Sequence, residues 1–341
     1  MKVEDITHVC VAPSLFPLLQ YLLLVDEDIA RKHTFYFFND VIPISIRNRF
    51  VCTCYIRQED TSIFVAIKKR IHKLLIALFR TWKYPFLKKA RIYAFDIPNL
   101  CVYIGNRPYE MLSDAPQCFT YNMQENSEEY KRQVSHRNTI SWWVQKLIYG
   151  DIYVGYYGNN KWCKLIHLTE ENISPVLKEK KTLIQSLDTL WSSASESKKQ
   201  FLLSLFDINQ DDIELLSSKP ILFFTQPLME DCHLSKEEYK DLLQKLFSHY
   251  NPNEILIKTH PRDKFDYSKE FQGISVYAKS VNSQLLQLIG LSPQKVVTFF
   301  SSAVEAFSMA ECDFYGTEVH PKVFAVFGDY KLKREVNQKV L

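Results

Sequence analysis

The sequence predicts an α/β protein built from two Rossmann-like domains that face a cleft. Short β-like runs alternate with helical runs between Ile6 and Tyr121, and the same alternation starts again after residue 220. This rhythm is typical of a parallel sheet covered by helices. A length of 341 residues with 46% apolar residues is sufficient for two domains, each with its own hydrophobic core. A helical segment joins the two halves.

In the N-terminal half, four apolar runs predict strands. The first, Ile6–Ala12, ends at Pro13 and Ser14, and a helical run over Leu15–Leu24 follows it. We expect these elements to form a domain over residues 1–170. The other predicted strands are Thr34–Phe38, Arg91–Phe95 and Gln117–Tyr121.

The C-terminal half begins with helices and continues as a second β/α series. From Pro175 to Lys219 there is no glycine and apolar residues recur at helical spacing, which predicts two or three helices. Residues 171–219 are therefore expected to form the helical connection, and residues 220–341 the second domain. Its predicted strands are Pro220–Thr225, Glu254–Lys258, Ile274–Tyr277 and Val296–Phe300, and its predicted helices are Lys236–Tyr250, Asn282–Ile289 and Ser302–Met309.

Several classes of protein are disfavoured by what the sequence lacks. The first glycine is Gly105, so no glycine-rich phosphate loop precedes it. The eight cysteines form no CxxC pair, and we expect reduced thiols in a cytosolic protein. The apolar run Leu15–Val25 has about half of the roughly 20 residues that a membrane span needs. Ser301 and Ser302 lack the GxSxG elbow of a serine hydrolase.

A basic segment is concealed by a net charge of only +3. Thr61–Phe95 contains nine Lys or Arg residues and no acidic residue. On a helical wheel Lys69, Lys73, Arg80 and Lys83 lie opposite an apolar face. Two interpretations stay open: a surface helix that packs its apolar face on the sheet, or a basic helix that contacts an anionic membrane. Both hold if the basic face alone touches lipid. The apolar face comprises Ile67, Ile71, Leu74, Leu75, Leu78 and Trp82.

A nucleic-acid-binding protein without catalysis is a further interpretation of this segment. Its aromatic residues are few, the rest of the chain is acidic in balance, and no DNA- or RNA-binding motif is present. We therefore expect no nucleic-acid partner.

Polar residues follow three of the predicted strands in the second half. Thr225 and Gln226 follow ILFF, Lys258 and His260 lie at the end of EILIK, and Ser301-Ser302 follows KVVTFF. Ligands of open α/β sheets bind at the carboxyl ends of the strands. Each motif alone is explained by strand termination or helix capping. Their joint position predicts a phosphate site, in which a histidine and two hydroxyls contact an anion.

These three motifs, in this order and spacing, resemble the family 52 glycosyltransferases, which are bacterial sialyltransferases of lipooligosaccharide and capsule synthesis. The resemblance implies a GT-B fold whose C-terminal domain holds CMP-sialic acid. His260 and Pro261 match the family's HP motif, whose histidine is the proposed general acid toward the CMP phosphate. The serine pair matches the family's phosphate-binding serines, and Thr225 and Gln226 match a stretch near the nucleotide. Lys258 and Arg262 are candidate extra charges.

The sequence departs from the family at the motif of two acidic residues and a glycine. The corresponding stretch is Tyr121–Tyr130, in which Glu125 falls on an acidic position in either of two registers. Asn126 or Ser127 replaces the glycine. The resemblance implies that Glu125 is the base that deprotonates the acceptor, and a solvated acidic turn ahead of a helix is the alternative.

The implied reaction is an inverting transfer of sialic acid from CMP-sialic acid to a sugar hydroxyl, with galactose expected as the acceptor sugar. No metal or other cofactor is expected, because a monophosphate leaving group carries less charge than a diphosphate. The single DxD-like run, Asp26–Asp28, is predicted to be a solvated helix end. The expected acceptor is a lipid-linked or surface glycan, and the expected location is the bacterial cytoplasm or the inner face of its membrane. The alternative is a GT-B transferase with another nucleotide sugar. A homodimer stays open.

Overall fold

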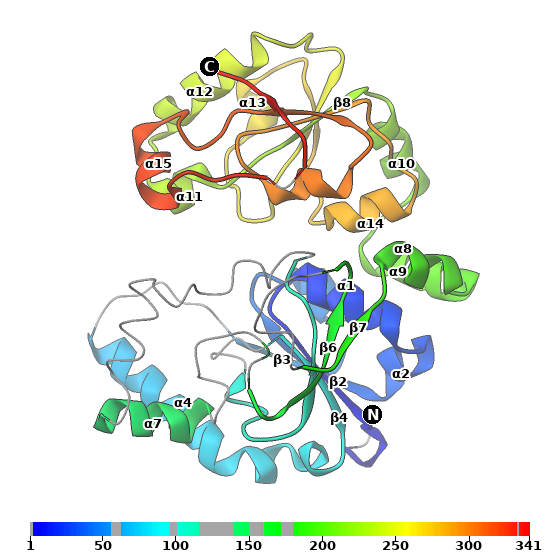
Figure 1. Cartoon of the computed structure of the whole chain (residues 1–341), viewed down its shortest axis with the longest axis vertical. Coiled ribbons are helices and arrows are strands. Elements are labelled where there is room, and N and C mark those ends of the chain that lie inside the picture. Colours follow the sequence, from blue (N-terminus) through cyan, green and yellow to red (C-terminus); the bar gives the residue numbers. More distant parts are fainter. Residues whose placement is uncertain are drawn as a thin grey trace. The chain divides into compact units, whose positions relative to one another are not determined.

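The computed structural model describes residues 3–55, 63–95, 101–115, 139–149, 158, 160–171, 180–332 and 334–341. The chain forms two compact units, Met1–Leu202 and Leu203–Leu341 (Figure 1). The division falls inside helix α9 (Glu196–Leu205), within the segment that the sequence predicts as helical. The expected α/β class with two parallel sheets is confirmed.

In the described residues, the N-terminal unit contains a parallel sheet of order β3-β2-β1-β4-β5-β6-β7. The interior strand β1 is a run of His-Val-Cys-Val-Ala whose last four residues are buried, as expected for a strand covered on both faces. The strands are β1 (His8–Ala12), β2 (Thr34–Asn39), β3 (Cys52–Tyr55), β4 (Arg91–Ala94), β5 (Tyr109–Met111), β6 (Cys163–Leu168) and β7 (Thr182–Ile184).

Helices cover both faces of this sheet (Figure 1). Helix α1 lies on one face, where Tyr21 packs edge-on against Tyr36 of β2. Helices α4 and α7 lie on the other face and contribute Ile76 and Ile148 to the core cluster with Val9. The described helices of the unit are η1 (Val3–Asp5), α1 (Leu15–Leu24), α2 (Glu27–Lys32), α3 (Ile44–Arg47), α4 (Ile63–Lys83), η2 (Pro85–Lys88), α7 (Ile140–Tyr149), α8 (Leu187–Ser193) and α9.

We expected helix α4 to pack its apolar face on the sheet, but most of that face is exposed to solvent. The side chain of Trp82 is 84% exposed, whereas Ile76 and Ala77 are buried. Arg80, expected on an outer basic face, is directed inward instead, and its Nη1 donates to the Val102 carbonyl at 2.9 Å. Burial, with Arg107 nearby, lowers the pKa of Arg80 to about 10. The helix is oriented by this partly buried hydrogen bond and by the packing of Ile76 and Ala77 in the core. Neither α4 nor another helix in the described ranges is long and apolar enough to cross a membrane.

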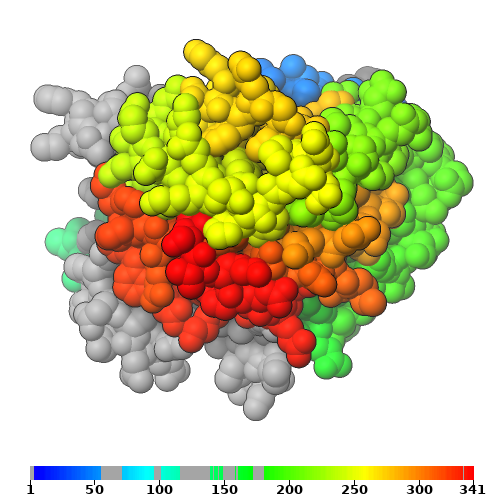
Figure 2. Space-filling view, turned by 90° about the horizontal axis from the view of Figure 1, so that it is seen from above, coloured from blue at the N-terminus to red at the C-terminus, as the bar shows by residue number. Residues whose placement is uncertain are grey.

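The C-terminal unit is a second parallel sheet of order β10-β9-β8-β11-β12-β13. Figure 2 shows the last residues of the chain, in red, at its surface between yellow and orange segments. The strands are β8 (Ile221–Phe224), β9 (Ile255–Lys258), β10 (Ser275–Tyr277), β11 (Lys295–Thr298), β12 (Glu311–Phe314) and β13 (Asn337–Gln338). The helices are α10 (Gln210–Ser217), α11 (Leu228–Cys232), α12 (Lys236–Phe247), α13 (Tyr267–Glu270), α14 (Ser283–Leu288), η5 (Ser302–Ala306) and α15 (Pro321–Phe327).

Two predicted elements are wrong. Thr182–Ile184 is an edge strand rather than part of a helix. The predicted helix Ser302–Met309 is a 3-10 helix that stops at Ala306. At the end of this helix the guanidinium of Arg334 donates hydrogen bonds to the carbonyls of Val304 and Phe307. These hydrogen bonds take the place of those that a longer helix would form. The predicted strand Gln117–Tyr121 lies outside the described residues.

Candidate active site

Three strand ends of the C-terminal sheet meet at one edge. Strand β8 lies between β9 and β11, and all three are parallel, so Phe224 is level with Lys258 on one side and Thr298 on the other. Neighbouring strands are about 4.8 Å apart. The residues that follow these ends are therefore brought together as the sequence predicts, with Thr225 and Gln226 in the middle.

The side chain of Thr225 ties β8 to the loop that follows β9. It is 2% exposed. Its Oγ1 donates to Asp263 Oδ2 at 2.6 Å and accepts from the backbone N–H of His260 at 2.9 Å. Its own N–H donates to the Lys258 carbonyl at 3.1 Å. The backbone of His260 is thus fixed relative to the sheet.

Asp263 is an acidic residue of this edge to which the sequence analysis assigned no role. Besides Thr225 it accepts from the Tyr267 hydroxyl at 2.6 Å and from the Phe265 N–H at 3.1 Å. Burial raises the pKa of its carboxyl, and the hydrogen bonds from Thr225 and Tyr267 oppose that shift. The position of Asp263 three residues after His260 was the available signal, but a hydrogen bond to a distant threonine is not visible in sequence.

The imidazole of His260 has one nitrogen committed to the protein. Its Nδ1 accepts from the N–H of Arg262 at 3.1 Å. In the neutral ring the proton is therefore on Nε2, which is a hydrogen-bond donor. Burial, with the charges of Arg262 and Lys258, lowers the pKa of His260 to about 4, although Asp231 acts in the opposite direction. His260 is neutral at pH 7.

Arg262 is held in an ion pair. Its two terminal nitrogens donate to the two carboxylate oxygens of Asp231 on α11, at 2.6 and 2.8 Å. A bidentate pair of this kind fixes the orientation of both groups. The exposed Pro261 lies between His260 and this pair.

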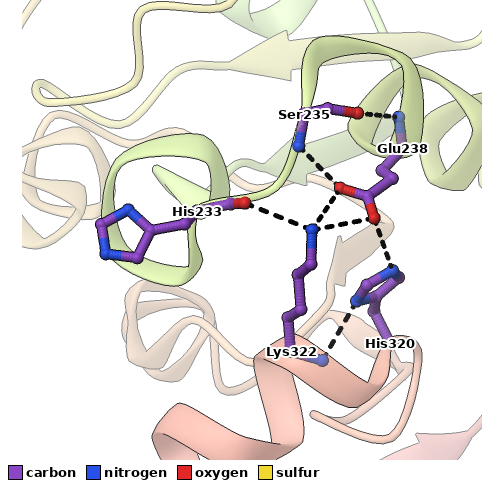
Figure 3. A network of polar contacts seen from close by, with 5 residues as sticks. All are labelled: His233, Ser235, Glu238, His320 and Lys322. Atoms are coloured by element: carbon purple, nitrogen blue, oxygen red, sulfur yellow. Dashed lines mark hydrogen bonds and ion pairs between the residues drawn. The ribbon is translucent and has the colours of Figure 1, made fainter.

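A second polar cluster holds the far end of α11 (Figure 3). Lys322 Nζ donates to the carbonyl of His233, the C-cap of α11, at 3.4 Å and to the carboxylate of Glu238 at 2.8 and 2.9 Å. Glu238 also closes the capping box of α12 with Ser235. The hydrogen bond from Lys322, followed by that from Ser235, lowers the pKa of Glu238 to about 2. His320 caps α15 and lies 3.8 Å from Glu238. The cluster joins α11, α12 and α15, and so steadies the helix that carries Asp231.

Lys258 is a buried cationic residue beneath the same edge. Its side chain is 4% exposed. Nζ donates to the Thr259 carbonyl at 2.7 Å and lies 5.7 Å from the centre of the Tyr277 ring. Burial lowers the pKa of Lys258 to about 7. The hydroxyl of Tyr277 is buried and has no hydrogen-bond partner within the described protein. The buried amine of lowered pKa and the buried hydroxyl without a partner belong to paired residues of β9 and β10, and a ligand group would complete such polar groups.

On the other side of β8, Gln226 and the serine pair complete the edge. Gln226 Oε1 accepts from the Phe300 N–H at 3.1 Å, and the Ser301 N–H donates to Thr298 Oγ1 at 2.9 Å. Ser301 Oγ accepts from the Ala303 N–H at 3.3 Å, and a hydroxyl that accepts one bond still carries its own O–H donor. Ser302 is exposed. The Ser301 hydroxyl is thus held beside the strand-end edge at which the sequence predicts a phosphate site, and Ser302 follows it as the first residue of η5.

The remaining candidates lie in the N-terminal unit. Glu125 lies outside the described residues. Lys69 lies on α4, Lys73 is half-buried and Lys83 is exposed. The described residues hold no group of three or more His, Cys, Asp or Glu side chains placed for a metal ion.

Asp114 is a further carboxylate at the carboxyl edge of the N-terminal sheet. It follows β5 and accepts from Ser14 Oγ at 2.6 Å, in the turn after β1. Burial raises the pKa of Asp114, and the bond from Ser14 opposes that shift. A carboxylate with a raised pKa at a strand end is suited to proton transfer.

Comparison with known proteins gives a family and a fold. The model of glycosyltransferase family 52 matches residues 99–323. An uncharacterised protein of Haemophilus influenzae is 28% identical over 313 residues, which is 92% of this chain and 95% of that protein.

Solved structures resemble the whole chain at low sequence identity. A Photobacterium sp. JT-ISH-224 2,6-sialyltransferase, solved with CMP and lactose, superposes with a TM-score of 0.56 at 11% identity, over 94% of this chain and 74% of that chain. The α/β-galactoside α-2,3-sialyltransferase of Photobacterium phosphoreum gives 0.54 at 12% identity, over 94% and 95%. The UDP-GlcNAc 2-epimerase of Methanocaldococcus jannaschii gives 0.51 at 9% identity, over 90% and 83%. The chain therefore has the GT-B-like fold that transferases and epimerases share.

Proposed function

The chain belongs to glycosyltransferase family 52, and on that basis we propose that it is an inverting sialyltransferase. It moves sialic acid from CMP-sialic acid to a hydroxyl of a terminal sugar, expected to be galactose, on a bacterial glycan such as lipooligosaccharide or capsule. The family match includes every residue of the strand-end cluster, from Thr225 to Ser302. That the protein is a glycosyltransferase agrees with the expectation from its motifs.

The observation that carries the proposal is the fixed tautomer of His260. Because Nδ1 accepts from Arg262, Nε2–H is the donor left for a ligand. The hydroxyls of Ser301 and Ser302 follow β11, two strands from β9, or about 10 Å away. We propose that the CMP phosphate lies over Thr225 and accepts hydrogen bonds from both sides of this edge.

His260 acquires the proton for the leaving group when the sugar donor binds. Free His260 is neutral at pH 7 because its pKa is lowered to about 4. An anion beside an imidazole favours the charged ring, so the bound phosphate raises this pKa and His260 takes up a proton on Nδ1, which gives up its hydrogen bond from the Arg262 N–H. When the bond from the sugar to the phosphate oxygen breaks, its electron pair stays on that oxygen and His260 donates the proton to it. Lys258 supplies further positive charge beneath the phosphate.

The acceptor is activated by a carboxylate of the N-terminal unit. Its hydroxyl gives a proton to the carboxylate while the oxygen attacks the sugar from the face opposite the phosphate, and a single displacement inverts the centre. The family resemblance assigns this role to Glu125. Asp114 is the alternative, because it lies at a strand end of the N-terminal sheet and is hydrogen-bonded to Ser14. Transfer to lactose separates them: Glu125→Gln is expected to lose at least a hundredfold, whereas Asp114→Asn and the neighbouring control Glu128→Gln stay within a few-fold. The reverse pattern assigns the base to Asp114.

Nucleotide titration tests the donor directly. Thermal-shift and calorimetric titrations with CMP, CDP, UMP, UDP and GDP, in the presence of EDTA, are expected to show selective stabilisation by CMP. The variant Ser301→Ala/Ser302→Ala is expected to lose that response, and Ser308→Ala to retain it. Calorimetry in buffers of different ionisation enthalpy is expected to show proton uptake with CMP that is reduced in His260→Asn, and the remaining uptake is expected at Lys258, whose pKa is about 7 in the free protein. Transfer from CMP-sialic acid is expected to fall by orders of magnitude in His260→Ala.

One alternative donor follows from the fold, which is shared with a UDP-GlcNAc 2-epimerase. Preferential stabilisation by UDP would keep the glycosyltransferase and discard the sialyl donor. Loss of transfer in EDTA, restored by magnesium, would overturn the metal-independent reaction that we propose from the lower charge of a monophosphate leaving group.

A further inference from the structure

The connection between β11 and β12 carries the serine pair and has little regular structure of its own. The two strands are parallel neighbours, and strands of this kind are usually joined by an α-helix. Here the connection contains only the 3-10 helix η5, which begins at Ser302 and ends at Ala306. Its carbonyl groups between Val304 and Ala310 are therefore open to hydrogen-bond partners from outside the connection.

A single side chain from the C-terminal end of the chain, Arg334, supplies such partners. Its Nη1 donates to the carbonyls of Val304 at 3.0 Å and Phe307 at 2.7 Å. Its Nη2 donates to the carbonyl of Ala310, and to that of Ser308 at 3.5 Å. A guanidinium holds its donors in a rigid planar fork, so this one group links η5 to the residue that directly precedes β12.

Aromatic rings of the same part of the chain contact the residue before the serine pair. Phe300 directly precedes Ser301 and is 3% exposed. Its ring packs against those of Phe327 and Tyr330, whose centres lie 4.8 and 5.8 Å away. The C-terminal residues therefore contact the connection on both sides of the serine pair, through Phe300 before it and through Arg334 after it.

The backbone that carries Arg334 is fixed to the sheet by other contacts. Strand β13 pairs with β12 so that Asn337 lies opposite Asp313. Asn337 Nδ2 donates to Asp313 Oδ1 at 3.3 Å, and Asp313 is 2% exposed. The Lys339 N–H donates to the Phe314 carbonyl at 2.8 Å. Arg334 thus reaches the connection from a segment that does not depend on η5 for its own position.

We propose that Arg334 is a positioning residue of the phosphate site, which holds the serine pair in place before the nucleotide binds. The proposal rests on the proposed function, in which Ser301 and Ser302 bind the donor phosphate. Arg334 acts through backbone carbonyls and does not contact the phosphate. Groups that are already ordered lose less conformational entropy when a ligand binds. Without the guanidinium, η5 loses the hydrogen bonds that join it to β12, and the nucleotide must order the serine pair itself.

Nucleotide affinity and steady-state kinetics test this role. Arg334→Ala is expected to raise the Kd for CMP and the KM for CMP-sialic acid at least about tenfold, with the KM for lactose unchanged. A merely structural role would instead lower the amount of active enzyme and leave both KM values alone. Arg334→Lys is expected to lie in between, since an ammonium has donors without the fork. A Kd and a donor KM equal to those of the wild type in Arg334→Ala would overturn the proposal.

The matched control removes another cation of the same segment. Lys331 is exposed and lies 3.0 Å from Asp329, and Lys331→Ala is expected to bind CMP as the wild type does. Guanidinium chloride, well below denaturing concentrations, is expected to restore CMP affinity severalfold in Arg334→Ala, because it can occupy the space that the side chain leaves. It is expected to restore none in Ser301→Ala/Ser302→Ala. Equal recovery in both variants would contradict the proposal.

Hydrogen exchange of the nucleotide-free protein separates this proposal from the choice of donor. The amides of residues 301–310 are expected to exchange at least about tenfold faster in Arg334→Ala than in the wild type, and those of β8 at an unchanged rate. Unchanged exchange over residues 301–310 would overturn the proposal, whichever nucleotide binds. If exchange rises as expected while the wild type does not respond to CMP, the hold of Arg334 on the serine pair is supported and the sialyl donor is the part that fails.

Discussion

The burial of Lys258 has a stability consequence that can be measured. Its pKa is lowered from 10.5 to about 7 by burial, and a tenfold change in an acid dissociation constant corresponds to about 1.4 kcal/mol. A neutral side chain of similar volume escapes this cost, which approaches about 5 kcal/mol when the amine is fully protonated. Lys258→Met forfeits the hydrogen bond to the Thr259 carbonyl, which contributes about 1 kcal/mol. We therefore expect the variant to be about 3–4 kcal/mol more stable at pH 6.5.

The pH dependence of this difference identifies its cause. Between pH 7 and 10.5 the unfolded chain keeps the proton on Lys258 while the folded chain has lost it, so wild-type stability rises with pH across that range. Urea unfolding at pH 7 and pH 9 is expected to show that the advantage of Lys258→Met falls by about 2 kcal/mol. The control Lys264→Met changes an exposed lysine and is expected to give a difference that does not vary with pH. Parallel wild-type and Lys258→Met curves would refute the reasoning.

Three further predictions concern the same two units. Thr225→Val is expected to destabilise the protein by about 2–4 kcal/mol, because it loses the hydrogen bond to the Asp263 carboxylate and the one from the His260 N–H. Urea unfolding midpoints measure this loss, and Thr225→Ser should retain most of the stability. Gly105→Ala is expected to lower the free energy of unfolding by about 2 kcal/mol, because Gly105 has φ +60 and a Cβ would displace the guanidinium of Arg80. If the effects of Gly105→Ala and Arg80→Leu were simply additive in the double mutant, the displacement of Arg80 would be contradicted. The pKa of His260 is lowered to about 4 in the folded protein. As pH falls below about 6.5, the histidine therefore binds a proton in the unfolded chain before it does so in the folded one, and about 2 kcal/mol of stability is expected to be lost by pH 4.5. The variant His260→Asn should lack that part of the loss.

The strand ends could be predicted from sequence because their signals are local. ILFF before Thr225 and EILI before Lys258 are short apolar runs that end in polar residues, and a central parallel strand needs such a run. The edge at which they meet follows from strand polarity alone. The contacts that fix the site do not follow in this way, because the Asp263–Thr225 bond joins residues 38 positions apart.

Helix α4 shows a second limit of sequence analysis. The helical wheel states correctly which residues share a face, but it does not state which face meets the core. A basic residue is normally placed outside, yet Arg80 finds a carbonyl acceptor at Val102 and is retained inside at the cost of a lowered pKa. Short strands are missed by sequence analysis for a different reason. Tyr109–Met111 has only three residues and a charged centre, so no alternation can be recognised.

The fold alone does not select the donor, since sialyltransferases and a UDP-sugar epimerase share it. Selection must lie in the groups at the strand ends. In the free protein the imidazole of His260 is neutral and has Nε2–H as its donor, and the two serine hydroxyls are neutral as well. Lys258 is buried, and its pKa is lowered to about 7. In the proposed complex His260 gains a proton, so that one imidazolium and one amine of lowered pKa face the phosphate. This limited positive charge suits a monophosphate better than a diphosphate, which carries more charge and calls for a stronger cation. This is the physical reason to expect the titration to favour CMP, and Arg262 is withheld from such a role by its pairing with Asp231. If UDP stabilises the protein more than CMP, then Asp231→Asn, which releases that guanidinium from its ion pair, should strengthen the UDP response further.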